Sequence, residues 1–171
     1  MVARFGDAKD GGFWQSTGDA KDLILRVKDD YDGAEPSGNS VATMALLKLA
    51  AITERKDFRA AADQTLRLFS DRLQQFPQAV PHMLAALDFA SEEPRRAVLA
   101  GDVTSAEGRA LLRAAHSAFQ PNKVVTGTTG LVEPFAKTLT PKDNRPTAYV
   151  CTGTACQPPT HDTAKLKTLL K

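Results

Sequence analysis

Lys28-Asp29-Asp30-Tyr31-Asp32-Gly33-Ala34-Glu35-Pro36-Ser37-Gly38-Asn39-Ser40 is the stretch that decides the fold of this chain. It is polar and rich in turn-forming residues, and an apolar run follows it at once. Gly33 and Gly38 permit backbone angles that are closed to other residues, and Pro36 fixes the turn between them. Its last part supplies side chains suited to capping a helix: Ser37, Asn39 and Ser40. The stretch predicts a loop that presents polar groups to a ligand at a helix start, with a well-capped helix as the alternative interpretation.

The composition is that of an ordinary globular protein. Of the 171 residues, 42% are hydrophobic and 25% are charged, which is enough to bury a sizeable core. The formal net charge is +2, from 22 basic and 20 acidic residues that are well mixed along the chain. Because no long basic run occurs, we expect neither nucleic acid nor an anionic membrane as a partner.

Membrane-spanning and secretory segments are recognised in a sequence by the length of their apolar runs. No apolar run reaches the ~18–20 residues that are needed to span a bilayer, and the first residues lack the apolar core of a signal peptide. We therefore expect a cytoplasmic protein. In that compartment the two cysteines are expected to be reduced thiols rather than a disulfide framework.

Helices are predicted for the first half of the chain. Residues 39–53 are apolar on almost every side, residues 57–76 carry one apolar stripe at steps of three and four, and residues 80–91 are again largely apolar. A helix that is apolar all round must be enclosed by neighbours, whereas a single stripe is typical of an outer helix. This alternation favours two concentric layers of antiparallel helices.

The periodicity changes after Pro94. Strands are predicted at 97–101 and 123–126, with a helix between them that opens at the capping box Thr104-Ser105-Ala106-Glu107. Strand, helix and strand in this order predict a βαβ unit. A third strand is expected at 147–151 and a closing helix at 162–170. The chain is thus expected to be mainly α, with helical hairpins over 1–93 and a small α/β appendage over 94–171.

A series of motifs follows the chain in order: Gly11-Gly12-Phe13, the Lys28–Ser40 loop, Leu84-Ala85-Ala86-Leu87-Asp88, Pro121-Asn122-Lys123-Val124-Val125, and Ala148-Tyr149-Val150-Cys151 with Cys156 and Pro159. Together they resemble the YyaL-like family, which includes the spermatogenesis-associated thioredoxin-domain proteins. The segment Pro36-Ser37-Gly38-Asn39-Ser40 is the most specific of these motifs.

The resemblance implies a fold and partners. Such proteins look like a thioredoxin-like N-terminal domain followed by an (α/α) six-hairpin toroid, similar to N-acylglucosamine and cellobiose 2-epimerases and to six-hairpin glycosidases. This chain would match only the last hairpins and the α/β appendage, so its partners would be the missing N-terminal toroid and the thioredoxin-like domain of the same protein. Helices that are apolar all round would then have few partners here, which predicts exposed apolar surface.

Candidate site residues come from the loop. Epimerisation or glycoside hydrolysis needs an acid–base pair, and we expect Asp32 and Asp29 to supply it, with an Asx turn as the alternative role of Asp32. A carbohydrate ligand would be bound by further residues of the same loop: Lys28, Tyr31, Glu35, Ser37, Asn39 and Ser40. No cofactor is expected, because no nucleotide-binding or metalloprotease motif occurs in the chain.

Three side chains that can ligate a metal lie within a short stretch: Cys151, Cys156 and His161. A structural zinc site usually needs four ligands at closer spacing, and a redox pair is usually Cys-x-x-Cys. Buried structural cysteines at a strand end are therefore favoured, and no metal is expected.

Two functions are consistent with these features. The first is the C-terminal segment of a carbohydrate-active, epimerase-like or glycosidase-like toroid protein. The second is a non-catalytic scaffold or binding module that supports a thioredoxin-like domain in thiol redox chemistry.

Overall fold

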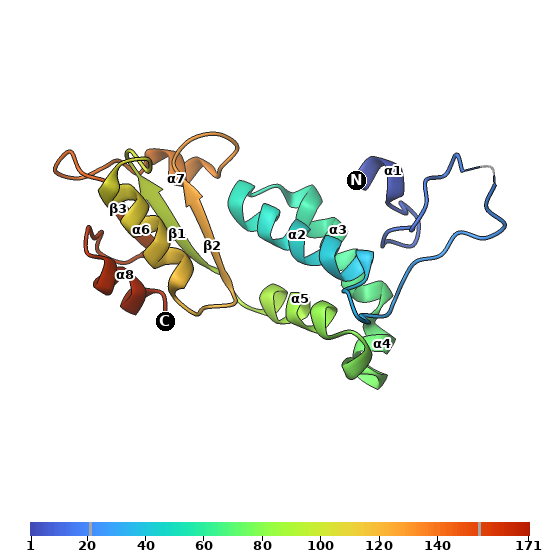
Figure 1. Ribbon diagram of the computed structural model, residues 1–171. Coiled ribbons are helices and arrows are strands. Elements are labelled where there is room, and N and C mark those ends of the chain that lie inside the picture. Colours follow the sequence, from blue (N-terminus) through green and yellow to red (C-terminus); the bar gives the residue numbers. More distant parts are fainter. Residues whose placement is uncertain (21, 154) are drawn as a thin grey trace. The chain divides into compact units, whose positions relative to one another are not determined.

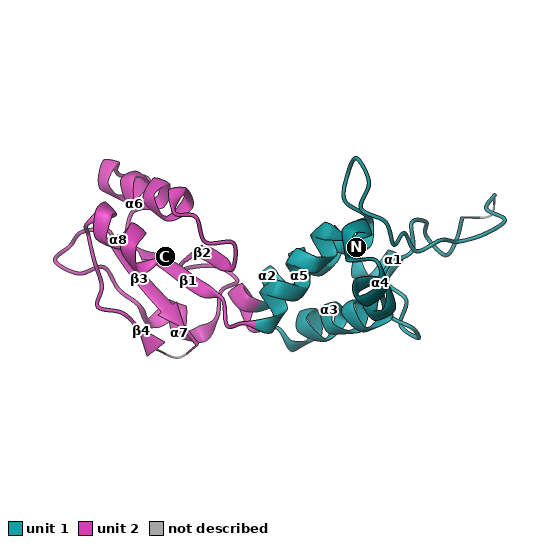
Figure 2. Ribbon diagram, turned by 90° about the horizontal axis from the view of Figure 1, so that it is seen from below, with its two compact units in different colours: residues 1–50, 55–91 teal, residues 51–54, 92–171 magenta. Residues whose placement is uncertain are grey.

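The structure is a computed structural model that describes residues 1–20, 22–153 and 155–171. The chain divides into two compact units, which Figure 2 shows in different colours. Unit 1 comprises Met1–Ala50 and Arg55–Ser91, and unit 2 comprises Ala51–Glu54 and Glu92–Lys171. Over the described residues the fold is mixed α/β, with helices in both units and a four-stranded sheet in unit 2.

Unit 1 is helical (Figure 1). Its elements are α1 (Val2–Phe5), α2 (Gly38–Thr53, whose last residues belong to unit 2), α3 (Lys56–Leu68), α4 (Ser70–Gln75), the 3-10 turn η1 (Pro77–Ala79) and α5 (Pro81–Ser91). The helices predicted at 39–53 and 80–91 are confirmed to within one residue at each end.

The single helix predicted over 57–76 is wrong, because the chain leaves helical geometry at Phe69, where φ is −97° and ψ is 15°. The apolar spacing continues through the break. Leu66, Phe69 and Leu73 all lie in one buried cluster, to which Val80 and Met83 also belong. The predicted apolar stripe is therefore buried, but two shorter helices bury it as well as one long helix would.

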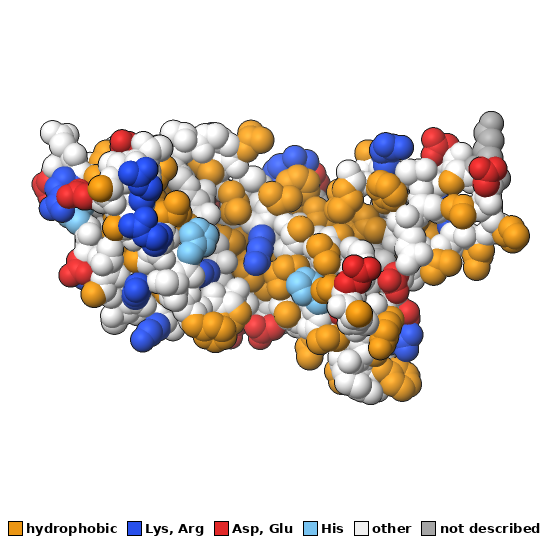
Figure 3. All heavy atoms as spheres, viewed as in Figure 1, with side chains coloured by type: hydrophobic (Ala, Val, Ile, Leu, Met, Phe, Trp, Pro, Cys, Tyr) orange, Lys and Arg blue, Asp and Glu red, His pale blue; other side chains and the backbone are white. Residues whose placement is uncertain are grey.

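Helices α2 and α5 bury one side and expose apolar residues on another. In α2, Leu46 and Leu47 are buried, whereas Val41 and Leu49 are 48% and 42% exposed. In α5, Leu84 and Leu87 are exposed, and Figure 3 shows hydrophobic side chains gathered on the surface over the helices of unit 1. The exposed apolar surface that the family resemblance implied is thus present, whereas the full enclosure that the helix pattern by itself indicated is not.

Unit 2 contains a mixed sheet in the order β2-β1-β3-β4. Its strands are β1 (Arg95–Ala100), β2 (Lys123–Gly127), β3 (Thr147–Thr152) and β4 (Ala155–Cys156). Strands β1 and β2 are parallel and are connected through α6 (Ala106–Ser117), so the predicted βαβ unit is confirmed. Strand β3 then adds to the other side of β1 in antiparallel register.

The sheet is covered on both faces, which explains why its central strand is a continuous apolar run. On one face Ala97 and Leu99 join a cluster with residues of α6 and of α8 (Thr163–Leu169). On the other face Val98 and Ala100 join a cluster that includes Ala136 of the short helix α7 (Pro134–Thr138). Alternate residues of β1 therefore belong to two different cores. The helix α7 lies in a segment where no helix was predicted.

No helix in the described part of the chain is long and apolar enough to cross a membrane.

The start of α6 is fixed by a close backbone approach. The N-cap is Ser105, whose Oγ accepts a hydrogen bond of 3.0 Å from the N–H of Gly108. The capping box predicted at residues 104–107 is therefore wrong, because the third helical residue is Gly108 and Glu107 pairs with Arg145 instead. A Cβ atom added to Gly108 would lie 2.2 Å from the carbonyl oxygen of Asp102. Only glycine leaves room for this turn.

We predict that Gly108→Ala destabilises unit 2 by about 1–3 kcal/mol, the usual cost of inserting an atom into a closely packed site. Helix propensity alone would predict the opposite sign, because it favours alanine over glycine by about 1 kcal/mol. Urea denaturation followed by circular dichroism measures the change.

Gly38→Ala is the matched control, because Gly38 also lies at a helix N-terminus but has no atom within 4 Å of an added Cβ. Its expected effect is within about 0.5 kcal/mol. Equal losses of stability in the two variants would contradict the role given to the close approach.

Candidate functional site

The loop Lys28–Ser40 has a buried side that is built around Asp32. Asp32 is 7% exposed. Its Oδ1 accepts a hydrogen bond of 2.8 Å from the N–H of Ser37, and its Oδ2 accepts bonds of 2.8 Å and 3.2 Å from the N–H groups of His82 and Met83. Asp32 therefore caps the start of α5 from a distant part of the sequence and closes its own loop at the same time.

The environment of Asp32 favours its charged form. Burial by itself would raise the pKa of this carboxyl group, but the hydrogen bonds from Ser37, Ser40, Met83 and His82 outweigh burial and lower the pKa below its ordinary value. The backbone N–H of Asp32 also donates to the carbonyl of Ala79 at 2.8 Å. This geometry gives Asp32 a role in holding the loop and the start of α5, but not as the Asx turn named as its alternative role, because its local bond is to the N–H of Ser37, five residues on.

Ser37 caps the start of α2 through Ser40. The Ser37 Oγ accepts from the N–H of Ser40 at 3.1 Å and donates to the Ser40 Oγ at 2.9 Å. Both residues are buried, with 3% and 0% of their surface exposed. Their hydroxyl groups are thus engaged within the loop, and their predicted contact with a ligand stays a prediction.

Asn39 attaches the N-terminal segment to the loop. Its Oδ1 accepts from the N–H of Phe13 at 2.7 Å, and its Nδ2 donates to the carbonyl groups of Phe13 and Asp29, each at 3.0 Å. Gly12 makes this approach possible, since its φ of +73° is unfavourable for other residues and an added Cβ would lie 3.2 Å from the Asn39 Oδ1. The side chain of Asn39 therefore satisfies both backbone hydrogen-bonding groups of Phe13, as a neighbouring strand would do in a sheet.

Lys28 is held at the base of the same segment. Its Nζ lies 2.8 Å from Asp7 Oδ2 and 2.6 Å from the carbonyl oxygen of Gly11, and it lies over the ring of Trp14 at 4.6 Å from the centroid. The hydrogen bond from Lys28 lowers the pKa of Asp7 to about 2. The ammonium group is thus occupied by this chain. Asp7 was not predicted, because nothing in its sequence surroundings marks it.

The accessible side of the loop carries the remaining candidates. Tyr31 is 59% exposed, Glu35 is exposed and Asp29 is half-buried. Asp29 Oδ1 accepts a local hydrogen bond of 3.2 Å from the N–H of Tyr31, which leaves Oδ2 of the half-buried carboxylate able to meet a ligand. The loop therefore contains buried residues that fix its conformation and accessible residues that could contact a ligand.

Asp30 forms a contact that the sequence did not indicate. Its Oδ2 lies 2.9 Å and 2.6 Å from the Nε and Nη2 atoms of Arg72 in α4, and Arg72 lies over the ring of Phe76. These side chains border a surface depression of ≈ 370 Å³ that also reaches Lys28 and Gln75. An apolar ring beside paired charged groups is suited to a polar organic ligand such as a sugar.

The cysteine prediction is wrong. Cys151 and Cys156 form a disulfide and are not reduced thiols, because β3 and β4 pair in a register that places the two residues opposite each other. Cys151 is buried and Cys156 is exposed, so only the first fits the expected pair of buried cysteines. Sulfur atoms joined in this way are not available as thiolate ligands for zinc.

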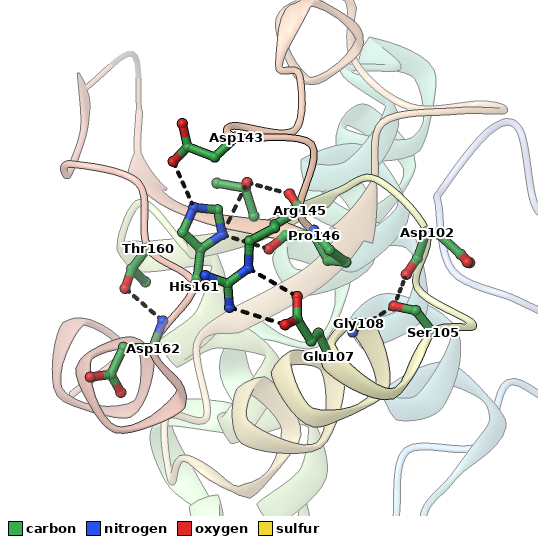
Figure 4. A network of polar contacts seen from close by, with 11 residues as sticks. Asp102, Ser105, Glu107, Gly108, Asp143, Arg145, Pro146, Thr160, His161 and Asp162 are labelled. Carbon is green, nitrogen blue, oxygen red and sulfur yellow. Dashed lines mark hydrogen bonds and ion pairs between the residues drawn. The ribbon is translucent and has the colours of Figure 1, made fainter.

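His161 lies in a polar network of unit 2 that Figure 4 shows from close by. Its Nδ1 is 2.9 Å from the carbonyl oxygen of Pro146 and therefore carries the hydrogen, and its Nε2 faces Asp143 at 3.6 Å. Arg145 pairs with Glu107 in the same network at 3.1 Å. Among the described residues no group of three or more His, Cys, Asp or Glu side chains is placed to hold a metal ion.

A buried ion pair in unit 2 was also missed. Arg96 of β1 contacts Glu133, whose side chain is 2% exposed, and the N–H of Glu133 donates to the carbonyl of Ile52 at 2.8 Å. The pKa of Glu133 is raised above its ordinary value. Burial raises it and the nearby Glu54 raises it further, and together they outweigh the positive charge of Arg96, which lowers it. The pair joins the sheet to the last turn of α2. Glu133 lies in a stretch rich in proline and glycine, where no periodic pattern identifies a buried position.

We predict that Asp32→Asn lowers the free energy of unfolding by about 2 kcal/mol at pH 7, because the amide nitrogen cannot accept from His82 and Met83. The folded-state pKa of Asp32 is lowered, so its contribution is complete above the unfolded value of about 3.9 and is lost as pH falls through the folded value. Chemical denaturation of both proteins between neutral and acidic pH should show the difference shrinking at low pH.

Asp29→Asn is the control for this prediction, because an asparagine Oδ1 can still accept from Tyr31. Its expected effect on stability is below about 0.5 kcal/mol. A stability difference for Asp32→Asn that does not depend on pH would show that the carboxylate charge does not matter.

Comparisons with known proteins place the chain in a family. No family model matches it and no solved structure matches it. It is 37% identical to spermatogenesis-associated protein 20 of Homo sapiens and 36% identical to that of Rattus norvegicus, in each case over 97% of this chain and 22% of the relative. It is also 37% identical over 55% of its length to the uncharacterized protein B0495.5 of Caenorhabditis elegans. The chain thus spans about a fifth of the length of its mammalian relatives, and it belongs to the family of spermatogenesis-associated protein 20.

Proposed function

We propose that this chain forms part of a cytoplasmic carbohydrate-active protein, and that the accessible side of the Lys28–Ser40 loop lines its sugar-binding cavity. The observation that carries the proposal is the division of the loop: Asp32 and Asn39 fix it from inside, while Asp29, Tyr31 and Glu35 stay accessible. Such a preorganised loop meets a ligand at a small entropic cost.

An α/α toroid is the architecture that we propose for the longer protein. The exposed apolar residues of α2 and α5, such as Val41 and Leu84, are what helices of an incomplete ring would show. The chain corresponds to 22% of spermatogenesis-associated protein 20, so that protein contains enough further residues to supply helical hairpins. A thioredoxin-like domain is the other partner that the motifs imply.

Within this proposal the two carboxylates have different roles. Asp29 is the better candidate for acid–base chemistry, since its side chain is half-buried and keeps room for a ligand. Asp32 acts as a positioning residue, because both of its oxygens accept backbone hydrogen bonds. Tyr31 and Glu35 would contact sugar hydroxyl groups, and Arg72 with Asp30 would extend the polar surface beside them.

Sugar titration followed by amide NMR tests the proposal on this chain. With N-acetylglucosamine, N-acetylmannosamine or cellobiose we expect a saturating shift of loop amides such as Tyr31 and Glu35. Asp29→Asn should weaken binding at least about tenfold, since a hydrogen bond to a charged group contributes about 1.5–3 kcal/mol. The exposed Asp10, which lies outside the loop, gives the matched control Asp10→Asn, with unchanged binding.

A second candidate function is a non-catalytic module that supports a thioredoxin-like domain in thiol redox chemistry. The Cys151–Cys156 disulfide is the observation that favours it. Loop amides that do not respond to any of the sugars would contradict the first candidate and favour the second.

A further inference from the structure

The disulfide of unit 2 joins two residues that already face each other in the sheet. Cys151 of β3 pairs with Cys156 of β4 in antiparallel register, and their Cα atoms are 4.0 Å apart. The two cysteines are five positions apart in the sequence, so the bond closes a very short loop. A disulfide that closes a short loop restricts the unfolded chain least and therefore contributes little to stability.

Backbone hydrogen bonds hold both sides of this hairpin without the disulfide. Strand β3 is paired with β1 along all of its residues, from Thr147 to Thr152. Beyond Cys156, the N–H of Gln157 donates to Val150 at 2.8 Å, and Thr160 exchanges bonds of 2.9 Å and 3.0 Å with Ala148. The sheet can therefore keep its register when the sulfur atoms separate, which is what a reversible bond requires.

The two cysteines differ in access. Cys151 is 1% exposed and belongs to the cluster that contains Val98 and Tyr149, whereas Cys156 is exposed on the short edge strand β4. A thiolate from solution can reach the disulfide only from the side of Cys156. The geometry therefore selects the sulfur that is attacked and the sulfur that leaves.

A cationic residue shares a face of the sheet with the leaving cysteine. Arg96 stands directly across from Cys151 in the register of β1 and β3, so the two side chains share one face of the sheet. The guanidinium also donates to the carbonyl of Gly153, between the two cysteines, while Glu133 holds it from the other side. A nearby guanidinium favours the thiolate form of a released cysteine.

We propose that Cys151–Cys156 is a reversible dithiol–disulfide site that accepts electrons from a dithiol reductant. A thiolate of the reductant attacks Cys156 Sγ, the Cys151–Cys156 bond breaks, and Cys151 leaves as a thiolate that then takes a proton. The second thiol of the reductant loses its proton and attacks its own sulfur in the mixed disulfide, which releases Cys156. Two electrons pass to the protein, and the reductant becomes a disulfide. This inference does not depend on sugar binding.

Reduction of the folded chain by dithiothreitol, the probe dithiol, tests the proposal. In native buffer we expect complete reduction, seen by mass spectrometry as two added alkyl groups after iodoacetamide treatment, and full return of the disulfide on oxidation with oxidised glutathione. Amide NMR should show the sheet of unit 2 intact in the reduced state, with shifts confined to the hairpin and to the surroundings of Arg96. Reduction that requires urea, or that unfolds unit 2, would overturn the proposal and make the bond a structural one.

Single-cysteine variants test the direction of attack. Cys151→Ala leaves Cys156 as the only thiol, and we expect it to react with Ellman's reagent at least about tenfold faster than the Cys151 thiol of Cys156→Ala. The double variant Cys151→Ala/Cys156→Ala supplies the control for folding, and its amide spectrum should match that of the reduced protein. Equal thiol reactivity in the two single variants, or a double variant that does not fold, would contradict the proposal.

Discussion

The buried carboxylate of Asp32 organises unit 1. Asp32 accepts three backbone hydrogen bonds, from the loop before α2 and from the first turn of α5, and these bonds compensate for the loss of hydration. Asp32 thereby couples the conformation of the loop to the start of α5, some fifty residues further along the chain. Whatever the accessible side of the loop binds, its shape depends on this carboxylate.

The loop also connects to the N-terminal segment through Asn39 and Lys28. One amide side chain binds the backbone of Phe13 on both its N–H and its carbonyl group, and one ammonium group joins Asp7 to Gly11. Polar groups that are engaged in this way are poor candidates for direct ligand contact, although their types match those of a sugar site. The residues that remain accessible are fewer than the sequence suggested.

Periodicity and capping residues were sufficient to predict most of the elements. The helices at 39–53 and 80–91, the βαβ unit and the closing helix all follow from local patterns, because burial on defined faces leaves a regular apolar spacing. The break at Phe69 was not predictable in this way, since the apolar stripe continues through it. Helix α7 was not predictable either, because it is short and lies in a proline-rich segment without a periodic apolar pattern. In the candidate loop, residue types did not indicate which side chains point inward. Asp29 and Asp32 look alike in the sequence, and only the position of α5 distinguishes them.

The ion pair and the disulfide of unit 2 show a related limit of local patterns. Arg96, Glu133 and Cys156 come from separate segments that the sheet brings together, and a single sequence carries no signal of that proximity. Their arrangement links the hairpin at the edge of the sheet to the last turn of α2 through hydrogen bonds to Gly153 and Ile52.

Trp14 gives the two units different optical properties. It is the single tryptophan of the chain, it lies in unit 1, and the charged groups of Arg26 and Lys28 lie 4.8 Å and 4.6 Å from its ring centroid. Fluorescence excited selectively in the indole therefore arises from unit 1 alone, and its intensity and wavelength depend on whether these cations stay over the ring. The native protein thus carries its own spectroscopic reporter for the segment that the Lys28–Ser40 loop holds in place, while unit 2 stays silent at the same wavelength.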